Sequence, residues 1–158
     1  MFKFQTISKK VMGDLHTPVS IYLKVRDIYP ESALLESSDF HGNENSLSYI
    51  ALCPIASIGI NNGECTSEFP DGHREVKPLT EAYNVADAMN AFLSQFQVEG
   101  AERKICGLFG YTAFDAVRYF EQIPVMEAHH AENDAPDMLY ILYKHTLAFD
   151  HFKHELTL

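Results

Sequence analysis

Two segments organise the fold: Ala33-Leu34-Leu35-Glu36-Ser37-Ser38 and Ser46-Leu47-Ser48-Tyr49-Ile50-Ala51-Leu52. We interpret both as short β-strands, joined by a turn-rich loop that contains the Gly, Asn and Asp a chain reversal favours. The first segment is apolar until it ends in a carboxylate and two hydroxyls. Such an end is typical of a buried strand that opens into a polar pocket. The simpler interpretation, which spacing alone leaves open, is that Glu36 and Ser37 only cap the strand and hydrogen-bond the loop.

The composition indicates one globular domain. The chain has 158 residues, of which 46% are hydrophobic and 22% are charged, enough to bury a real core. No apolar run reaches the roughly 18 residues that a membrane-spanning helix needs. The N-terminus also lacks the apolar core of a secretory signal. We therefore expect a cytoplasmic protein without a membrane partner.

The charge argues against a nucleic-acid partner. The formal net charge is -10, and the acidic residues are spread along the chain. No basic stripe with interleaved aromatic residues is present to overcome the resulting repulsion. We expect no binding to nucleic acid.

The cysteines and histidines do not form a recognisable site. Cys53, Cys65 and Cys106 are widely spaced and include no CxxC pair, so we expect reduced core residues. The histidines cluster only at 129–130 and at His151-x-x-His154. Residues three apart on a strand point to opposite faces, so we expect no metal site.

Turn and capping signals predict the elements of the first half. Thr17 and Pro18 suit the N-cap and first position of a helix that Pro30 would end. Asn61-Asn62-Gly63 and Pro70-Asp71-Gly72 predict tight turns. The predicted strands are 2–8, the two segments quoted above, 55–60, 64–69 and 73–76.

The second half begins with a predicted helix from Pro78-Leu79-Thr80 to Gly100, whose apolar residues recur at intervals of three and four. Gly107 and Gly110 fall in a predicted strand, 104–111, where glycine indicates close approach of another backbone or a ligand. A short helix, 114–120, would pair Asp115 with Arg118 on its surface. We expect an exposed loop at 122–136 and a final hairpin of strands 138–149 and 152–158. The predicted fold class is α+β, an antiparallel meander packed with a few helices.

No catalytic motif stands out. The glycines lack the spacing of a phosphate-binding loop, and no Ser, His and Asp constellation or nucleophilic cysteine signature is evident. Paired acids for glycoside chemistry are neither favoured nor excluded. The residues by themselves indicate a ligand-binding or interaction domain.

Several short motifs, each weak alone, are strong together because they follow one order along nearly the whole chain. They are Thr17-Pro18-Val19, Leu34 to Ser37, Ser48 to Ala51, Gly107 to Tyr111, Val117 to Glu121, and Pro136-Asp137-Met138 leading to Phe149-Asp150-His151. In this order the chain resembles the N-terminal domain of anthranilate synthase component I, a chorismate-utilising family.

The resemblance implies a two-domain αββα sandwich enzyme of tryptophan biosynthesis, a lyase. Such an enzyme converts chorismate, with ammonia from a glutamine amidotransferase partner (component II), into anthranilate and pyruvate. It implies that the catalytic residues and Mg²⁺ lie in a C-terminal domain. We expect residues 1–158 to be a fragment without that domain, carrying no catalytic residue, binding no cofactor and inactive alone.

The resemblance also implies a feedback-inhibition site for L-tryptophan, of which this chain holds half. Carried over by motif, its residues are Leu35, Glu36 and Ser37. Many relatives have an Arg before the second strand, where this chain has Ser46-Leu47, and Ala51 replaces a Gly. We therefore expect backbone N–H groups near Leu47 to meet the tryptophan carboxylate.

Three alternatives remain open. The related aminodeoxychorismate synthase component I is one, although the Leu-Glu-Ser motif and the Asp14-Leu15-His16-Thr17-Pro18 start point away from it. A stand-alone domain that senses an amino acid is another. The third is a purely structural interaction domain.

Overall fold

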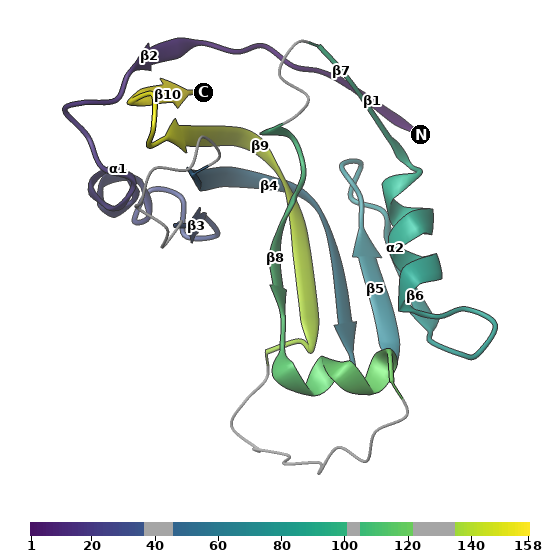
Figure 1. The fold of residues 1–158 in the computed structure, drawn as a ribbon. Helices are drawn as coiled ribbons and strands as arrows, with labels where there is room; N and C mark the ends of the chain where they lie inside the picture. The colour runs from purple at the N-terminus through teal and green to yellow at the C-terminus, as the bar shows by residue number, and fades with distance from the viewer. Residues whose placement is uncertain (37–45, 101–104, 122–134) are drawn as a thin grey trace. The chain divides into compact units, whose positions relative to one another are not determined.

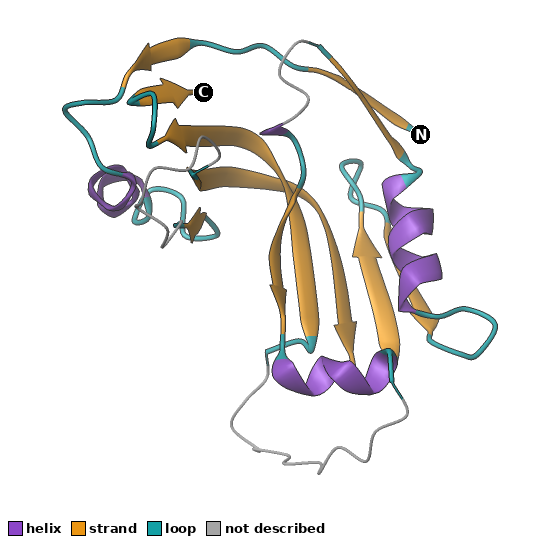
Figure 2. Cartoon of the chain, in the orientation of Figure 1, coloured by secondary structure: helices purple, strands orange, loops and turns teal. Residues whose placement is uncertain are grey.

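The computed structural model describes residues 1–36, 46–100, 105–121 and 135–158, and it confirms the α+β class (Figure 1). Figure 2 shows mostly strand with few helices. The helices are α1 (Pro18–Val25), α2 (Val85–Leu93) and the 3-10 helix η2 (Phe114–Tyr119). The strands are β1 (Phe2–Gln5), β2 (Lys10–Met12), β3 (Ala33–Leu35), β4 (Leu47–Asn61), β5 (Glu64–Glu68), β6 (Arg74–Pro78), β7 (Phe96–Glu99), β8 (Leu108–Thr112), β9 (Met138–Asp150) and β10 (Glu155–Thr157). The predicted loop 122–136 lies almost wholly outside the described residues.

The strands form one large and one small sheet. The order in the eight-stranded sheet is β2-β10-β9-β4-β5-β6, with β3 also paired to β4 and β8 to β9. β1 and β7 form the small sheet. The chain divides into two compact units, and both β4 and β9 contribute residues to each. The first unit is Met1–Phe2, Ala56–Gln97 and Gly110–Ile141, and the second is Lys3–Ile55, Val98–Phe109 and Leu142–Leu158.

The predicted hairpins are confirmed. β4 and β5 pair antiparallel with Asn61 opposite Glu64, and the turn places Asn62 and Gly63 at φ 49° and 77°. Left-handed φ at both positions is what a tight two-residue hairpin requires, and Asn-Gly adopts it at low cost. The final hairpin is also present, with Asp150 opposite Glu155.

The predicted start of helix α1 is confirmed, but its end is wrong. The Thr17 hydroxyl accepts a hydrogen bond from the Ser20 N–H at 3.1 Å, and Ser20 Oγ accepts from the Thr17 N–H at 3.0 Å. These reciprocal bonds satisfy N–H groups that have no partner inside the helix. The helix ends at Val25, well before Pro30, and turns follow.

Helix α2 is shorter at both ends than predicted. The helix begins at Val85 rather than at Pro78-Leu79-Thr80, and its N-cap is Asn84, because Asn84 and Asp87 form reciprocal side-chain-to-backbone bonds of 3.1 Å. After Leu93 the chain becomes strand β7, where the Phe96 ring stacks 5.7 Å from Phe2. Pairing with β1, far away in sequence, therefore overrides a local helical pattern.

Strands at the N-terminus also differ from the prediction. The single strand expected at 2–8 ends at Gln5, and a separate strand, β2, follows. Val11 of β2 pairs with Leu156 of β10 in an antiparallel register. Only a long-range partner defines this strand, so the local pattern could not reveal it.

The core of each unit is apolar, but the cysteines do not all belong to it. In the first unit Ile58, Ile60 and Phe92 are buried, and in the second Ile50 and Phe149 are buried. The cysteines are free thiols, with Cys65 buried, Cys53 half-buried and Cys106 exposed. The prediction of three core cysteines therefore holds only for Cys65.

Gly110 allows β8 to approach β9 closely. A Cβ at this position would collide with the backbone of Leu139, whereas a Cβ at Gly107 would meet nothing within 4 Å. Close backbone approach is one of the reasons for glycine within a strand. The prediction of close backbone approach is confirmed for Gly110, and no described backbone approaches Gly107 in this way.

We predict that Gly110→Ala destabilises the protein by about 3 kcal/mol, because backbone atoms cannot move aside for the added methyl group. The matched control, Gly107→Ala, should change the free energy of unfolding by less than about 0.5 kcal/mol. Urea unfolding followed by circular dichroism measures both. Equal midpoints for the two variants would contradict the β8–β9 contact.

Arg118 pairs with Asp137 rather than with the predicted partner Asp115. Its Nη2 donates to Asp137 Oδ2 at 2.6 Å, and the Tyr119 hydroxyl donates to the same oxygen at 2.6 Å. The Gly63 N–H in turn donates to the Tyr119 oxygen at 3.0 Å. The carboxylate therefore connects η2, the start of β9 and the β4–β5 turn, all within the first unit.

Asp137→Asn should lower the free energy of unfolding by about 2 kcal/mol, because it weakens two charge-assisted bonds at a carboxylate whose side chain is only 15% exposed. Asp115→Asn, the matched control, should cost less than about 0.5 kcal/mol. Thermal and urea unfolding of the two variants provide the comparison. A larger loss for Asp115→Asn would restore the pairing predicted from helical spacing.

Candidate functional site

The residues implied for the tryptophan site lie where β3 ends beside the start of β4. The strands pair antiparallel, with Leu34 opposite Ile50 and Leu35 opposite Tyr49. Leu35 is 37% exposed, Glu36 is exposed and Leu47 is half-buried. The structure thus brings the end of β3 to the first residues of β4. Ser37 lies outside the described residues.

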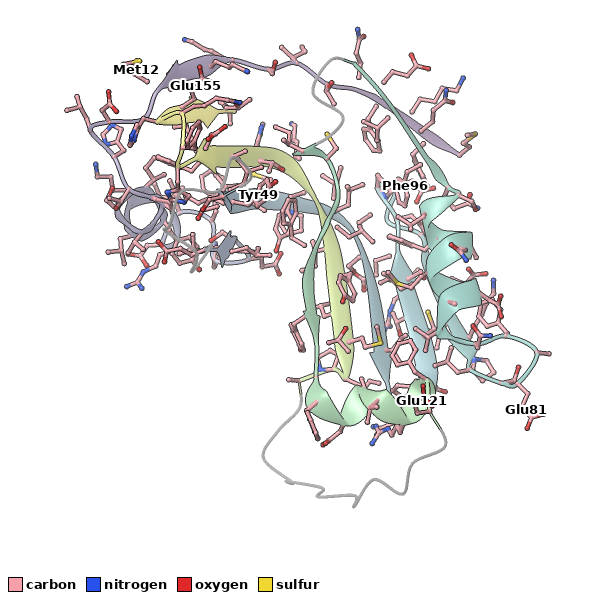
Figure 3. The ribbon with its side chains drawn as sticks, viewed as in Figure 1. Met12, Tyr49, Glu81, Phe96, Glu121 and Glu155 are labelled. Atoms are coloured by element: carbon pink, nitrogen blue, oxygen red, sulfur yellow. The ribbon has the colours of Figure 1, made fainter. Side chains whose placement is uncertain are left out.

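One face of this strand pair carries an aromatic wall. Cross-strand partners share a face and alternate residues return to it, so Leu35, Leu47 and Tyr49 lie on the same side. Tyr49, labelled in Figure 3, belongs to β4. Its ring lies 5.5 Å from the Phe109 ring, and the Phe109 ring lies 6.2 Å from the Tyr143 ring. Phe109 and Tyr143 belong to the buried core, at 8% and 9% exposure, whereas Tyr49 is half-buried at its edge.

Burial raises the pKa values of the two tyrosines in this wall. Burial raises the pKa of the Tyr49 hydroxyl above its ordinary value of 10.0. The pKa of Tyr143 is also raised, mainly by burial and further by the nearby Glu31 carboxylate. Both hydroxyls therefore stay neutral in the physiological range, and they can donate hydrogen bonds.

The other face of β4 holds a buried polar contact that the sequence did not reveal. Ser48 is 1% exposed, and its Oγ lies 2.7 Å from His151 Nε2. The His151 backbone N–H donates to the Ser46 carbonyl at 3.1 Å. These contacts fasten the start of β4 to the turn between β9 and β10. Because Ser48 is inaccessible, we interpret the Ser–His pair as structural.

Asp150 shapes the turn that carries His151. Its Oδ1 accepts hydrogen bonds from the backbone N–H groups of Phe152 at 3.1 Å and Lys153 at 2.9 Å. Burial by itself would raise the pKa of this carboxyl. The bonds from Lys153 and its positive charge outweigh burial, so the pKa lies below its ordinary value of 3.8. The ionised form is therefore the one that stabilises the turn.

We predict that Asp150→Asn lowers the free energy of unfolding by about 1 kcal/mol at neutral pH. A carboxyl whose folded pKa is depressed contributes stability above its unfolded pKa and loses it as pH falls through the folded value. The difference between the two proteins should therefore shrink as pH falls below 3.8. Urea unfolding across this range measures the difference. A difference that does not change with pH would exclude the ionised carboxylate as its source.

The described residues show no metal-binding cluster. Residues 1–36, 46–100, 105–121 and 135–158 include no group of three or more His, Cys, Asp or Glu side chains that could hold a metal ion. His154 Nδ1 lies 3.9 Å from Asp14 Oδ1, whereas His151 contacts Ser48, so these two histidines have different partners. His129 and His130 lie outside the described residues. Within the same ranges no helix is both long and apolar enough to span a bilayer.

The fold defines an α+β domain built on antiparallel strands. No known protein-family model matches the chain. Its sequence is 28% identical over 160 residues to anthranilate synthase component 1 of Thermus thermophilus, a match that covers 100% of this chain and 32% of that protein.

Two further relatives carry the same name. The Pseudomonas putida protein is 30% identical over 148 residues, with 89% of this chain and 28% of that protein covered. The Synechocystis protein is 27% identical over 157 residues, with 97% of this chain and 30% of that protein covered. The chain spans about a third of these relatives' length, in their N-terminal part. The expected resemblance to the N-terminal domain of anthranilate synthase component I is thereby confirmed.

Proposed function

We propose that this chain is the N-terminal part of an anthranilate synthase component I that converts chorismate and ammonia into anthranilate and pyruvate. The observation that carries the proposal is similarity over nearly all of the chain to relatives from different bacteria that share this name. In this proposal a glutamine amidotransferase, component II, supplies the ammonia. The enzyme would act in the cytoplasm, in tryptophan biosynthesis.

The proposal assigns catalysis to the part of the relatives that this chain does not match. The chorismate-binding residues and Mg²⁺ belong there, and residues 1–158 serve as scaffold and regulatory half-site. Ser48, which contacts His151, is 1% exposed and is not assigned to chemistry. The 158-residue chain alone should therefore be inactive.

The proposed regulatory half-site combines an apolar surface with polar groups at the end of β3. Leu35 and Leu47, beside the Tyr49 wall, offer an apolar surface for an indole ring. The Glu36 carboxylate can meet the ligand ammonium, and the Ser37 hydroxyl can meet its other polar groups. Backbone N–H groups near Leu47 would receive the ligand carboxylate. Tryptophan would then inhibit by favouring an arrangement of the enzyme that binds chorismate poorly.

The activity can be tested on the full-length product of the gene that encodes this chain. With chorismate, Mg²⁺ and ammonia it should form anthranilate, detected by its fluorescence, and residues 1–158 alone should form none. Aminodeoxychorismate as the product would instead favour the related synthase of folate formation. A full-length protein that forms neither compound would refute the proposal and leave an amino-acid-sensing domain, which micromolar tryptophan binding by the isolated chain would support.

Ser37→Phe in the full-length enzyme should relieve tryptophan inhibition, because a phenyl ring would occupy the proposed half-site. We expect the half-inhibitory tryptophan concentration to rise at least about tenfold, equivalent to about 1.4 kcal/mol, with chorismate turnover maintained. The matched control is Ser94→Phe at the exposed end of α2. Unchanged inhibition in Ser37→Phe, or equal relief in both variants, would count against the assignment.

A further inference from the structure

A pocket beside helix α2 lies wholly within the first unit. Its volume is about 410 Å³, and its walls come from α2, β5, β6 and the first residues of the chain. In Figure 1 α2 runs beside β5 and β6. Leu35, Glu36 and Leu47, the described residues implied for tryptophan, do not line it. The pocket is therefore distinct from the site proposed for tryptophan.

The sheet register and two small helix residues create this space. Ser67 lies opposite Glu75 and Cys65 opposite Lys77, so these four side chains share one face of the β5–β6 hairpin. Helix α2 covers the β5 side of that face and brings Ala88 and Ala91 to the pocket wall. Alanine methyl groups leave room that a larger side chain would fill.

Aromatic rings form much of the wall. The Phe69 ring lies 5.5 Å from Phe92, and it stacks 6.0 Å from Phe2 and 5.9 Å from His73. Tyr83 lines the pocket as well. Faces of Phe and Tyr rings attract both flat apolar groups and cations.

The charged side chains of the pocket have a negative balance, because two carboxylates lie there with one lysine. Asp71 and Glu75 supply two carboxylates, and Asp71 Oδ1 is oriented by the His73 N–H at 3.0 Å. Lys77 Nζ lies 2.8 Å from Glu75 Oε1 and 5.8 Å from the Tyr83 ring centroid. An ammonium group of the chain is thus already held between a carboxylate and a ring face. This contact shows which type of head group the wall accommodates.

We propose that this pocket binds a small organic cation: a primary ammonium group carried on an aromatic ring. The ring packs against Phe69 and Phe92, and the ammonium group meets the Asp71 carboxylate, because Glu75 is already paired with Lys77 at 2.8 Å. An aromatic carboxylate, by contrast, would face both acids and would have to displace Glu75 from Lys77. The net charge of -10 adds to this preference.

The test uses the ¹⁵N-labelled 158-residue chain and three probes of similar shape: 2-phenylethylammonium, 2-phenylethanol and 3-phenylpropionate. At low salt the ammonium probe should shift the amide resonances of Ser67, Phe69 and His73. The alcohol should bind at least about fivefold more weakly, and the carboxylate more weakly still. Added salt should weaken binding of the ammonium probe.

Matched variants locate the site. Ala91→Leu fills the pocket and should reduce binding at least about tenfold, whereas Ala86→Leu, on the same helix but outside the lining, should not change it. Asp71→Asn should weaken the ammonium probe about threefold, and Glu64→Gln should have no effect. Thermal unfolding verifies that each variant is folded.

Three results would overturn the proposal: equal affinity for all three probes, undiminished binding in Ala91→Leu, or no resonance shift at about 10 mM ammonium probe. These measurements involve neither chorismate nor tryptophan. Failure here would therefore leave the proposed enzymatic function untouched, and failure of that function would leave this result standing.

Discussion

The antiparallel pairing of β4 is the constraint on which the rest of the structure depends. This strand runs from Leu47 to Asn61, and its buried residues include Ile50, Ile58 and Ile60. Each unit uses part of it. The first half of β4 positions β3 and the site proposed for tryptophan. The second half of β4 positions the β5–β6 hairpin, which lines the pocket beside α2. Exchange of its buried aliphatic side chains would therefore disturb both proposed sites at once.

Local chemistry made part of this fold predictable. The Asn62-Gly63 turn and the start of α1 at Thr17 and Pro18 follow from backbone preferences that a few residues determine. The elements that were missed, β2 and β7, depend on partners at the other end of the chain or many residues away. The same reason explains the wrong partner for Arg118, since helical spacing suggested Asp115 but tertiary contact supplied Asp137. Sequence patterns reflect interactions between residues that are close in the chain, whereas these contacts join residues that are far apart in it.

The candidate site was also only partly predictable from the sequence. Short motifs identified Leu35 and Glu36, and the structure places them at the end of β3 beside β4. They gave no indication of the wall formed by Tyr49, Phe109 and Tyr143, because its members come from three strands. The contact between Ser48 and His151 joins residues 103 positions apart. In the sequence, the only indication of this contact was that His151 directly follows Asp150 at the end of a strand.

The β4–β5 turn has a consequence for the chemical ageing of the protein. Asn-Gly is a thermolabile sequence because the nitrogen that follows asparagine can attack its side-chain amide, closing a succinimide ring and then leaving aspartate or isoaspartate. Here the attacking nitrogen belongs to Gly63, and its N–H is engaged by the Tyr119 oxygen at 3.0 Å. That oxygen is in turn fixed on Asp137. The carboxylate that organises this end of the first unit is thereby linked, through Tyr119, to the nitrogen whose attack would begin deamidation.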